Sequence, residues 1–115
     1  MLPKNNSLKK KKDFDFVFKK GRSFKEGFLV LKIISNNLEK SRFGIIISQK
    51  VSKKATVRNK IKRRIKVLIA KKLPQFKKNA DLVLIVIPGL ETKDILETEK
   101  MITKLLQRAN IINYV

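Results

Sequence analysis

The sequence contains no cysteine and no histidine among its 115 residues. Without cysteine, the chain can form neither disulfide bonds nor thiolate metal sites. The close carboxylate pair Asp13 and Asp15 is spaced i,i+2, which directs the two side chains apart on a helix. No general acid/base pair and no carboxylate cluster for a metal can be assembled from these residues. A protein nuclease that acts alone is therefore not indicated.

Long apolar runs are also missing. The first residues, MLPKNNSLKKKKDF, lack the apolar segment of a signal peptide, and no later run reaches the roughly eighteen apolar residues of a membrane span. A cytoplasmic protein without membrane contact is expected. A chain of 115 residues suits a single domain with one core, residues 1–115, and residues 1–11 are predicted to form a flexible basic tail.

Acidic residues are scarce: 9 stand against 29 Lys and Arg, for a formal net charge of +20. Residues 1–80 hold 25 basic and 4 acidic side chains, whereas residues 81–115 hold 4 and 5. Such a charge exceeds what solubility requires and indicates a polyanionic partner. That partner should contact the first two thirds of the chain.

Hydrophobic spacing and turn residues predict alternating helices and strands. In chain order we expect a helix at 13–20 ended by Gly21, a short strand at 23–24, strands at 28–34 and 42–49, a helix at 57–73 between Thr56 as N-cap and Pro74, a strand at 80–87 and a helix at 94–109. The strand at 80–87 is nearly all apolar, so both its faces should be covered. The order α-β-β-(β)-α-β-α predicts a small α+β two-layer sandwich, with a mixed sheet backed by helices.

The predicted helix at 57–73 carries an unusual charge. Ten of the twenty residues from Lys53 to Lys72 are basic and none is acidic. Val57, Ile61 and Ile65 begin an apolar stripe for the core, and the basic side chains occupy the adjoining arcs. Like charges recur at i,i+4, which costs a few tenths of a kcal/mol per pair in an isolated helix. A merely solvated face would carry glutamate partners, so this face is better explained by phosphates.

Three kinds of polyanion could bind this basic face of the helix. A membrane surface would require exposed apolar residues beside the basic arc, but the narrow stripe is needed by the core. DNA recognition is less favoured because no helix-turn-helix pair is predicted. Structured RNA fits best, since Lys and Arg can contact phosphates while Asn59 contacts a base edge, a 2′-hydroxyl or a hydrated metal.

The run from Arg42 to Lys66, RFGIIISQKVSKKATVRNKIKRRIK, closely resembles the signature of the bacterial ribonuclease P protein subunit. In that family an R-x-G strand leads through a basic loop into A-x-x-R-N-x-x-K-R, and an upstream L-x-x-x-x-DF-x-x-VF-x-x-G pattern is matched from Leu8 to Gly21. The chain departs from the pattern at Ser52, where many relatives have Gly in a loop one residue shorter. Leu31 also stands where some relatives carry an aromatic residue.

The resemblance implies a left-handed β-α-β crossover and a cofactor protein for a catalytic RNA that removes the 5′ leader of precursor tRNA. Magnesium would serve the RNA subunit, with no metal bound tightly by the protein and no obligate protein partner. A cleft between the first helix and the sheet, with Phe14, Phe18 and Leu31, would hold the leader. The residues expected to bind the catalytic RNA are Lys50, Lys53, Lys54, Arg58, Asn59, Lys62, Arg63 and Lys66.

Some residues admit two interpretations. Phe14 and Phe18 lie one turn apart, and such pairs usually belong to the core, whereas the resemblance places them in the leader cleft. Phe43 is expected in the core, Gly44 is expected to permit a close approach, and Asp13 is expected to stabilise the start of its helix. Two other functions stay open: a structural ribosomal or other RNA-binding protein, and a DNA-binding regulator.

Overall fold

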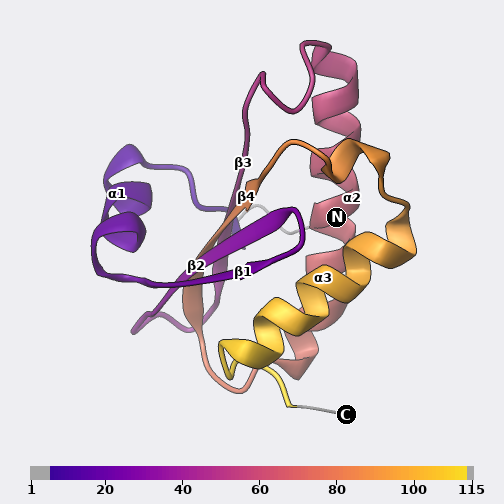
Figure 1. Cartoon of the computed structure of the whole chain (residues 1–115). Helices are drawn as coiled ribbons and strands as arrows, with labels where there is room; N and C mark the ends of the chain where they lie inside the picture. Colours follow the sequence, from indigo (N-terminus) through magenta and orange to yellow (C-terminus); the bar gives the residue numbers. More distant parts are fainter. Residues whose placement is uncertain (1–5, 114–115) are drawn as a thin grey trace.

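The computed structural model describes residues 6–113 and forms one mixed sheet with helices on both faces (Figure 1). The elements are α1 (Lys11–Lys20), β1 (Arg22–Glu26), β2 (Leu29–Ser35), β3 (Arg42–Ile47), α2 (Ala55–Lys72), β4 (Ala80–Val86) and α3 (Ile95–Arg108). The strand order is β1-β2-β4-β3, antiparallel except for the parallel pair β3 and β4. The predicted α+β order is confirmed, and the left-handed sense of the β3-α2-β4 crossover stays a prediction.

The main core lies between the sheet and the pair α2 and α3. Its largest fully buried side chains include Leu29 and Leu31 of β2, Leu82 of β4 and Ile65 of α2. The apolar stripe predicted on α2 is therefore confirmed. Val83, the residue after Leu82, is buried on the opposite face in a smaller cluster with Val17 of α1. Strand β4 is thus covered on both faces, as its apolar sequence predicted.

Several element boundaries differ from the prediction. The extra strand predicted at 23–24 is a full five-residue strand, because Phe24 pairs with Leu31 and packs against the main core. Thr56 as N-cap is wrong: the Lys54 carbonyl already accepts the amides of Val57 and Arg58 at 3.2 Å each. Helix α2 therefore begins at Ala55 and has no side-chain cap. Gly21 does end α1, and its backbone N–H donates a hydrogen bond to the Val17 carbonyl.

Residues 6–11 do not form the flexible tail that was predicted, while residues 1–5 lie outside the described part of the chain. Ser7 bridges Phe43 in parallel, and the Leu8 amide donates to the Phe43 carbonyl at 2.6 Å. Leu8 is buried beside Val17. The segment is ordered because β3 is an edge strand whose backbone offers free hydrogen-bonding groups to a neighbour.

Two adjacent residues of α1 fasten that helix to two positions of β3. Asp13 pairs with Arg42 at 3.4 Å, and Arg42 also holds the buried carboxylate of Asp81 through bonds of 2.9 and 2.6 Å. These bonds raise the pKa of Arg42 further above its usual value. Phe14 lies directly over Gly44, where any β-carbon would collide with its ring. The upstream DF pair and the R-x-G motif therefore build one joint, which sets the position of α1 on the sheet.

Candidate nucleic-acid interface

The basic loop before α2 is held in a defined shape. Val51 is buried in the main core and anchors the middle of the loop. Ser48 and Ser52 each accept an amide two residues further on, at 3.2 Å, through their hydroxyl groups. The Arg58 guanidinium donates to the Ser52 carbonyl at 2.7 Å and so closes the loop onto α2. The serine that departs from the family pattern is thus part of this local structure.

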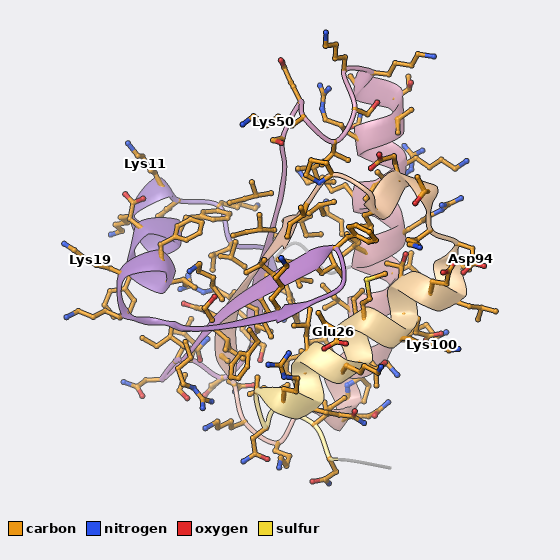
Figure 2. The ribbon with its side chains drawn as sticks, viewed as in Figure 1. Lys11, Lys19, Glu26, Lys50, Asp94 and Lys100 are labelled. Atoms are coloured by element: carbon orange, nitrogen blue, oxygen red, sulfur yellow. The ribbon has the colours of Figure 1, made fainter. Side chains whose placement is uncertain are left out.

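The predicted RNA-binding residues gather at the loop and along one side of α2. Figure 2 shows Lys50 at the loop, close to the start of α2. Arg58 and Lys66 are half-buried, and the other predicted positions of this set are exposed. Within residues 6–113 none of these side chains forms an ion pair, so their charge is uncompensated inside the protein. Those residues are Lys50, Lys53, Lys54, Arg58, Asn59, Lys62, Arg63 and Lys66, which we call the basic face.

A groove separates the basic face from the outer strand of the sheet. It has a volume of about 320 Å³ and is lined by Ile45, Ile46, Ile47, Arg58, Asn59 and Lys62. A smaller hollow of about 120 Å³ continues along β3, where Lys62 and Lys66 approach Phe14 and Gly44. We call the first hollow the edge groove. It can receive an RNA backbone, with phosphates against the cations and a sugar or base against the isoleucines.

The opposite face of the sheet is only partly covered by α1. Four residues on the α1 side of the sheet are half-buried: Val30 and Lys32 of β2, Ile46 of β3 and Ile85 of β4. We call these four residues the open sheet face. The assignment of Leu31 to a leader cleft is wrong, because Leu31 is fully buried in the main core on the side of α2 and α3. Because successive side chains of a strand point to opposite faces, Val30 and Lys32 of β2 instead lie on the face beside α1.

The phenylalanines of α1 differ in their surroundings. Phe14 is half-buried against Gly44 and Leu8, so most of its ring serves the packing of α1. Phe18 lies one turn later on the same flank and is 39% exposed. That flank is turned toward the open sheet face, since Phe14 lies over Gly44 on the same side of α1. Phe16 is 53% exposed on the other flank.

Sequence reasoning missed Lys32. Its signal was present: Lys32 is the single charged residue within the apolar run FLVLKII, and a charge in a paired strand marks the more exposed face. Phe43 does lie in the core, as expected, with its ring 5.7 Å from that of Phe76 in an edge-to-face contact.

Over residues 6–113, no three His, Cys, Asp or Glu side chains come together in a way that could hold a metal ion. The two carboxylates nearest the open sheet face, Asp13 and Asp81, are engaged by Arg42. In the same part of the chain, no helix combines the length and the apolar character needed to cross a membrane.

Comparison with known proteins gives one consistent family. The model of the family described as Ribonuclease P matches residues 2–110. A Ribonuclease P protein component of Synechocystis sp. is 44% identical over 88 residues, covering 76% of this chain and 71% of that protein. One from Rippkaea orientalis is 38% identical and covers 96% and 91% of the two chains.

Solved structures agree with the sequence comparisons. The RNase P protein of Staphylococcus aureus superposes with a TM-score of 0.86 at 27% identity, covering 94% of this chain and 98% of that one. The RNase P protein of Thermotoga maritima gives a TM-score of 0.80 at 29% identity, with coverage of 89% and 96%.

Proposed function

We propose how the surfaces of this chain divide its work, starting from its membership of the ribonuclease P protein family. As a member, the chain is the protein component of a ribonucleoprotein endoribonuclease that matures the 5′ end of tRNA. The basic face and the edge groove dock the catalytic RNA. The open sheet face, together with Phe18, holds the 5′ leader of precursor tRNA. The observation that supports this division is that the basic face lies on α2 and its loop, whereas the open sheet face lies on the α1 side of the sheet. Ile46 at the edge strand β3 borders both surfaces. We place the protein in the cytoplasm, where precursor tRNA is made and processed.

The chemistry of the basic face suits a folded RNA. Its cations come from an ordered loop and a rigid helix, so little conformational freedom is lost when phosphates bind. Arg58 is pre-positioned by Ser52, and Asn59 beside it supplies an amide for a base edge, a 2′-hydroxyl or a water of a hydrated metal. Docking at this face would fix the protein in one orientation on the catalytic RNA.

The open sheet face suits a single strand. Val30, Ile46 and Ile85 give an apolar floor, Lys32 gives a charge for a phosphate, and Phe18 offers an aromatic ring at the side. Stacking platforms beside a cation bind single strands without strict sequence preference. The leader would be recognised by this combination, so that precursor tRNA binds the holoenzyme more tightly than mature tRNA.

We assign no chemical step to the protein. Magnesium would act at the RNA subunit, and the lysines and arginines of the basic face would replace part of the cation atmosphere that a folded RNA otherwise requires. The protein then lowers the magnesium concentration needed for cleavage.

The test compares two exposed rings on one helix. Phe18→Leu keeps most of the apolar volume and removes the aromatic face, while Phe16→Leu makes the same change on the opposite flank. Stacking of one base is worth about 1–3 kcal/mol. We expect Phe18→Leu, and Lys32→Gln, to lower the ratio of precursor to mature tRNA affinity of the holoenzyme several-fold, with Phe16→Leu near wild type. Equal ratios for all three folded variants would show that the leader binds elsewhere.

A further inference from the structure

A hollow distinct from the two along β3 lies at the other end of the molecule from the start of α2. It has a volume of about 480 Å³ and forms where α1 ends, β1 begins and α3 ends. In Figure 1 the end of α3 and the connection from α2 to β4 lie at the bottom of the view, whereas the start of α2 lies at the top. The residues that line the hollow are Lys20, Arg22, Ile33, Ile34, Ser35, Lys78, Ala80, Ala109, Asn110 and Ile111.

The charge of this hollow is of one sign. Lys20, Arg22 and Lys78 come from three different segments, and no acidic side chain lines the hollow in the described part of the chain. Over residues 6–113 none of the three forms an ion pair. By contrast, Lys71 of α2 pairs with Glu99, and Arg108 of α3 pairs with Glu26.

Arg22 is held in place without being neutralised. One of its nitrogens, Nη2, donates to the Ala109 carbonyl at 3.2 Å, and its guanidinium lies 5.4 Å from the ring centre of Phe24. These contacts leave other N–H donors of the guanidinium group available to a ligand. On the C-terminal side, Lys77 bonds the side-chain oxygen of Asn110 at 2.5 Å. A fixed arginine flanked by two lysines is suited to a phosphate group.

We propose that this hollow binds a backbone phosphate of RNA, at a second contact separate from the basic face. The separation is large on the scale of the molecule, because Arg58 and Asn59 lie in the first two turns of α2, whereas Lys78 lies in the connection that follows its last residue, Lys72. A helix of 18 residues is about 27 Å long. A membrane is not favoured as the occupant, since none of the exposed large apolar side chains lines the hollow.

The proposal rests on the proposed RNA-binding function, and its test keeps the two apart. Lys20→Gln with Lys78→Gln removes two charges and leaves Arg22, which also supports α3, untouched. Lys100→Gln with Lys104→Gln removes two exposed charges of α3, outside the hollow; Figure 2 shows Lys100 beside that helix. Asn59→Ala with Arg63→Ala changes the basic face alone. Thermal melts of all three double variants establish that each is folded.

The expected effect follows from counterion release. Each phosphate contact steepens the slope of log affinity against log salt concentration by about 0.7 to 0.9. If the contact contributes nothing at about 1 M salt, it raises the affinity about five- to eightfold at about 0.1 M salt. Loss of the one phosphate contact at the hollow predicts about five- to eightfold weaker binding for Lys20→Gln/Lys78→Gln, with a slope shallower by about 0.7 to 0.9. The α3 control should stay close to wild type.

Two binding measurements identify the source of the phosphate. Weaker binding of the variant to the catalytic RNA alone assigns the phosphate to that RNA. Unchanged assembly with weaker binding of precursor tRNA assigns it to the substrate, and comparison of short and long leaders then separates the leader from the tRNA body. If the Lys20 and Lys78 variant matches the α3 control in both measurements while the Asn59 and Arg63 variant is impaired, the second site is refuted and the basic face stands. If neither variant is impaired, both proposals fail.

Discussion

Replacing Gly44 by alanine tests the joint between α1 and the sheet. Gly44 is buried on β3, and a β-carbon at this position would overlap the ring of Phe14, with the Leu8 β-carbon 3.5 Å away on another side. The ring cannot simply swing out, because α1 is also fastened by the ion pair of Asp13 with Arg42. We therefore expect Gly44→Ala to displace α1 and to lower the free energy of unfolding.

The size of the effect can be bounded from the packing. Inserting a methyl group into a packed site costs about 1–3 kcal/mol. Phe14→Leu removes the outer ring atoms and costs about 1–2 kcal/mol by itself, less than a full core truncation, because the ring is only half-buried. In the Phe14→Leu background the alanine methyl has room. The two changes together should then cost less than their sum by about 0.5–3 kcal/mol, the usual range for residues in contact.

Urea unfolding of the wild type, both single variants and the double variant gives this coupling energy directly. Phe18→Leu provides the control background, since Phe18 is not among the atoms closest to Gly44; there the cost of Gly44→Ala should be fully additive. Because the joint positions α1, Gly44→Ala should also reduce the preference for precursor tRNA. A Gly44→Ala protein within about 0.5 kcal/mol of wild type, or strict additivity with Phe14→Leu, would refute this account of the joint.

Four further outcomes are expected. Asn59→Ala and Arg63→Ala should weaken binding of the catalytic RNA and change stability by no more than about 0.5 kcal/mol, whereas fully buried Ile65→Ala should cost about 2–5 kcal/mol; calorimetric melts that ranked them the other way would overturn the face assignment. Affinity for the catalytic RNA should fall with salt with a log–log slope steeper than about −3.5, from five or more contacts, and a slope near zero would exclude phosphate docking. The protein alone should not cleave precursor tRNA, and adding it to the catalytic RNA should lower the magnesium midpoint of cleavage; cleavage by carefully purified protein would contradict the division of labour. Stability should be nearly constant between about pH 7 and about pH 9, because the chain has no histidine and the raised pKa of Arg42 keeps its contribution present throughout this interval. That contribution is lost only above the usual range of arginine, so a melting temperature that shifted strongly in this interval would point to another titrating group.

The elements with a regular hydrophobic pattern, α2 and β4, could be predicted from the sequence. On α2 the stripe that includes Ile61 and Ile65 follows the helical period, and the charges on the adjoining arcs marked the basic face without any knowledge of the fold. The apolar run of β4 likewise predicted burial on both sides, which Leu82 and Val83 confirm.

The errors came from features that the local sequence leaves undetermined. In FLVLKII the residues that point to either face of the strand are apolar, except for Lys32. The sequence therefore does not show which face of the sheet carries Leu31, and this follows only from its pairing with Leu84 of β4. Leu8 lies beside a run of lysines, and its burial depends on the edge of a strand 35 residues later in the chain. The bond of Arg42 to Asp81 joins residues 39 positions apart, so the motif was recognisable while its structural role was not.

The edge groove also bears on how the free protein avoids self-association. Within residues 6–113, Ser7 and Leu8 pair with the outer side of β3 only at Phe43, and no described segment pairs with the backbone from Ile45 to Ile47 on that side. Such edges invite pairing with another copy, and charged side chains placed along them prevent it by repulsion. Arg58 and Lys62 line the groove beside this edge, and we expect their charge to oppose such pairing in the free protein. A small multivalent anion would neutralise these cations without covering the strand, and light scattering should then report association of the free protein that the catalytic RNA suppresses.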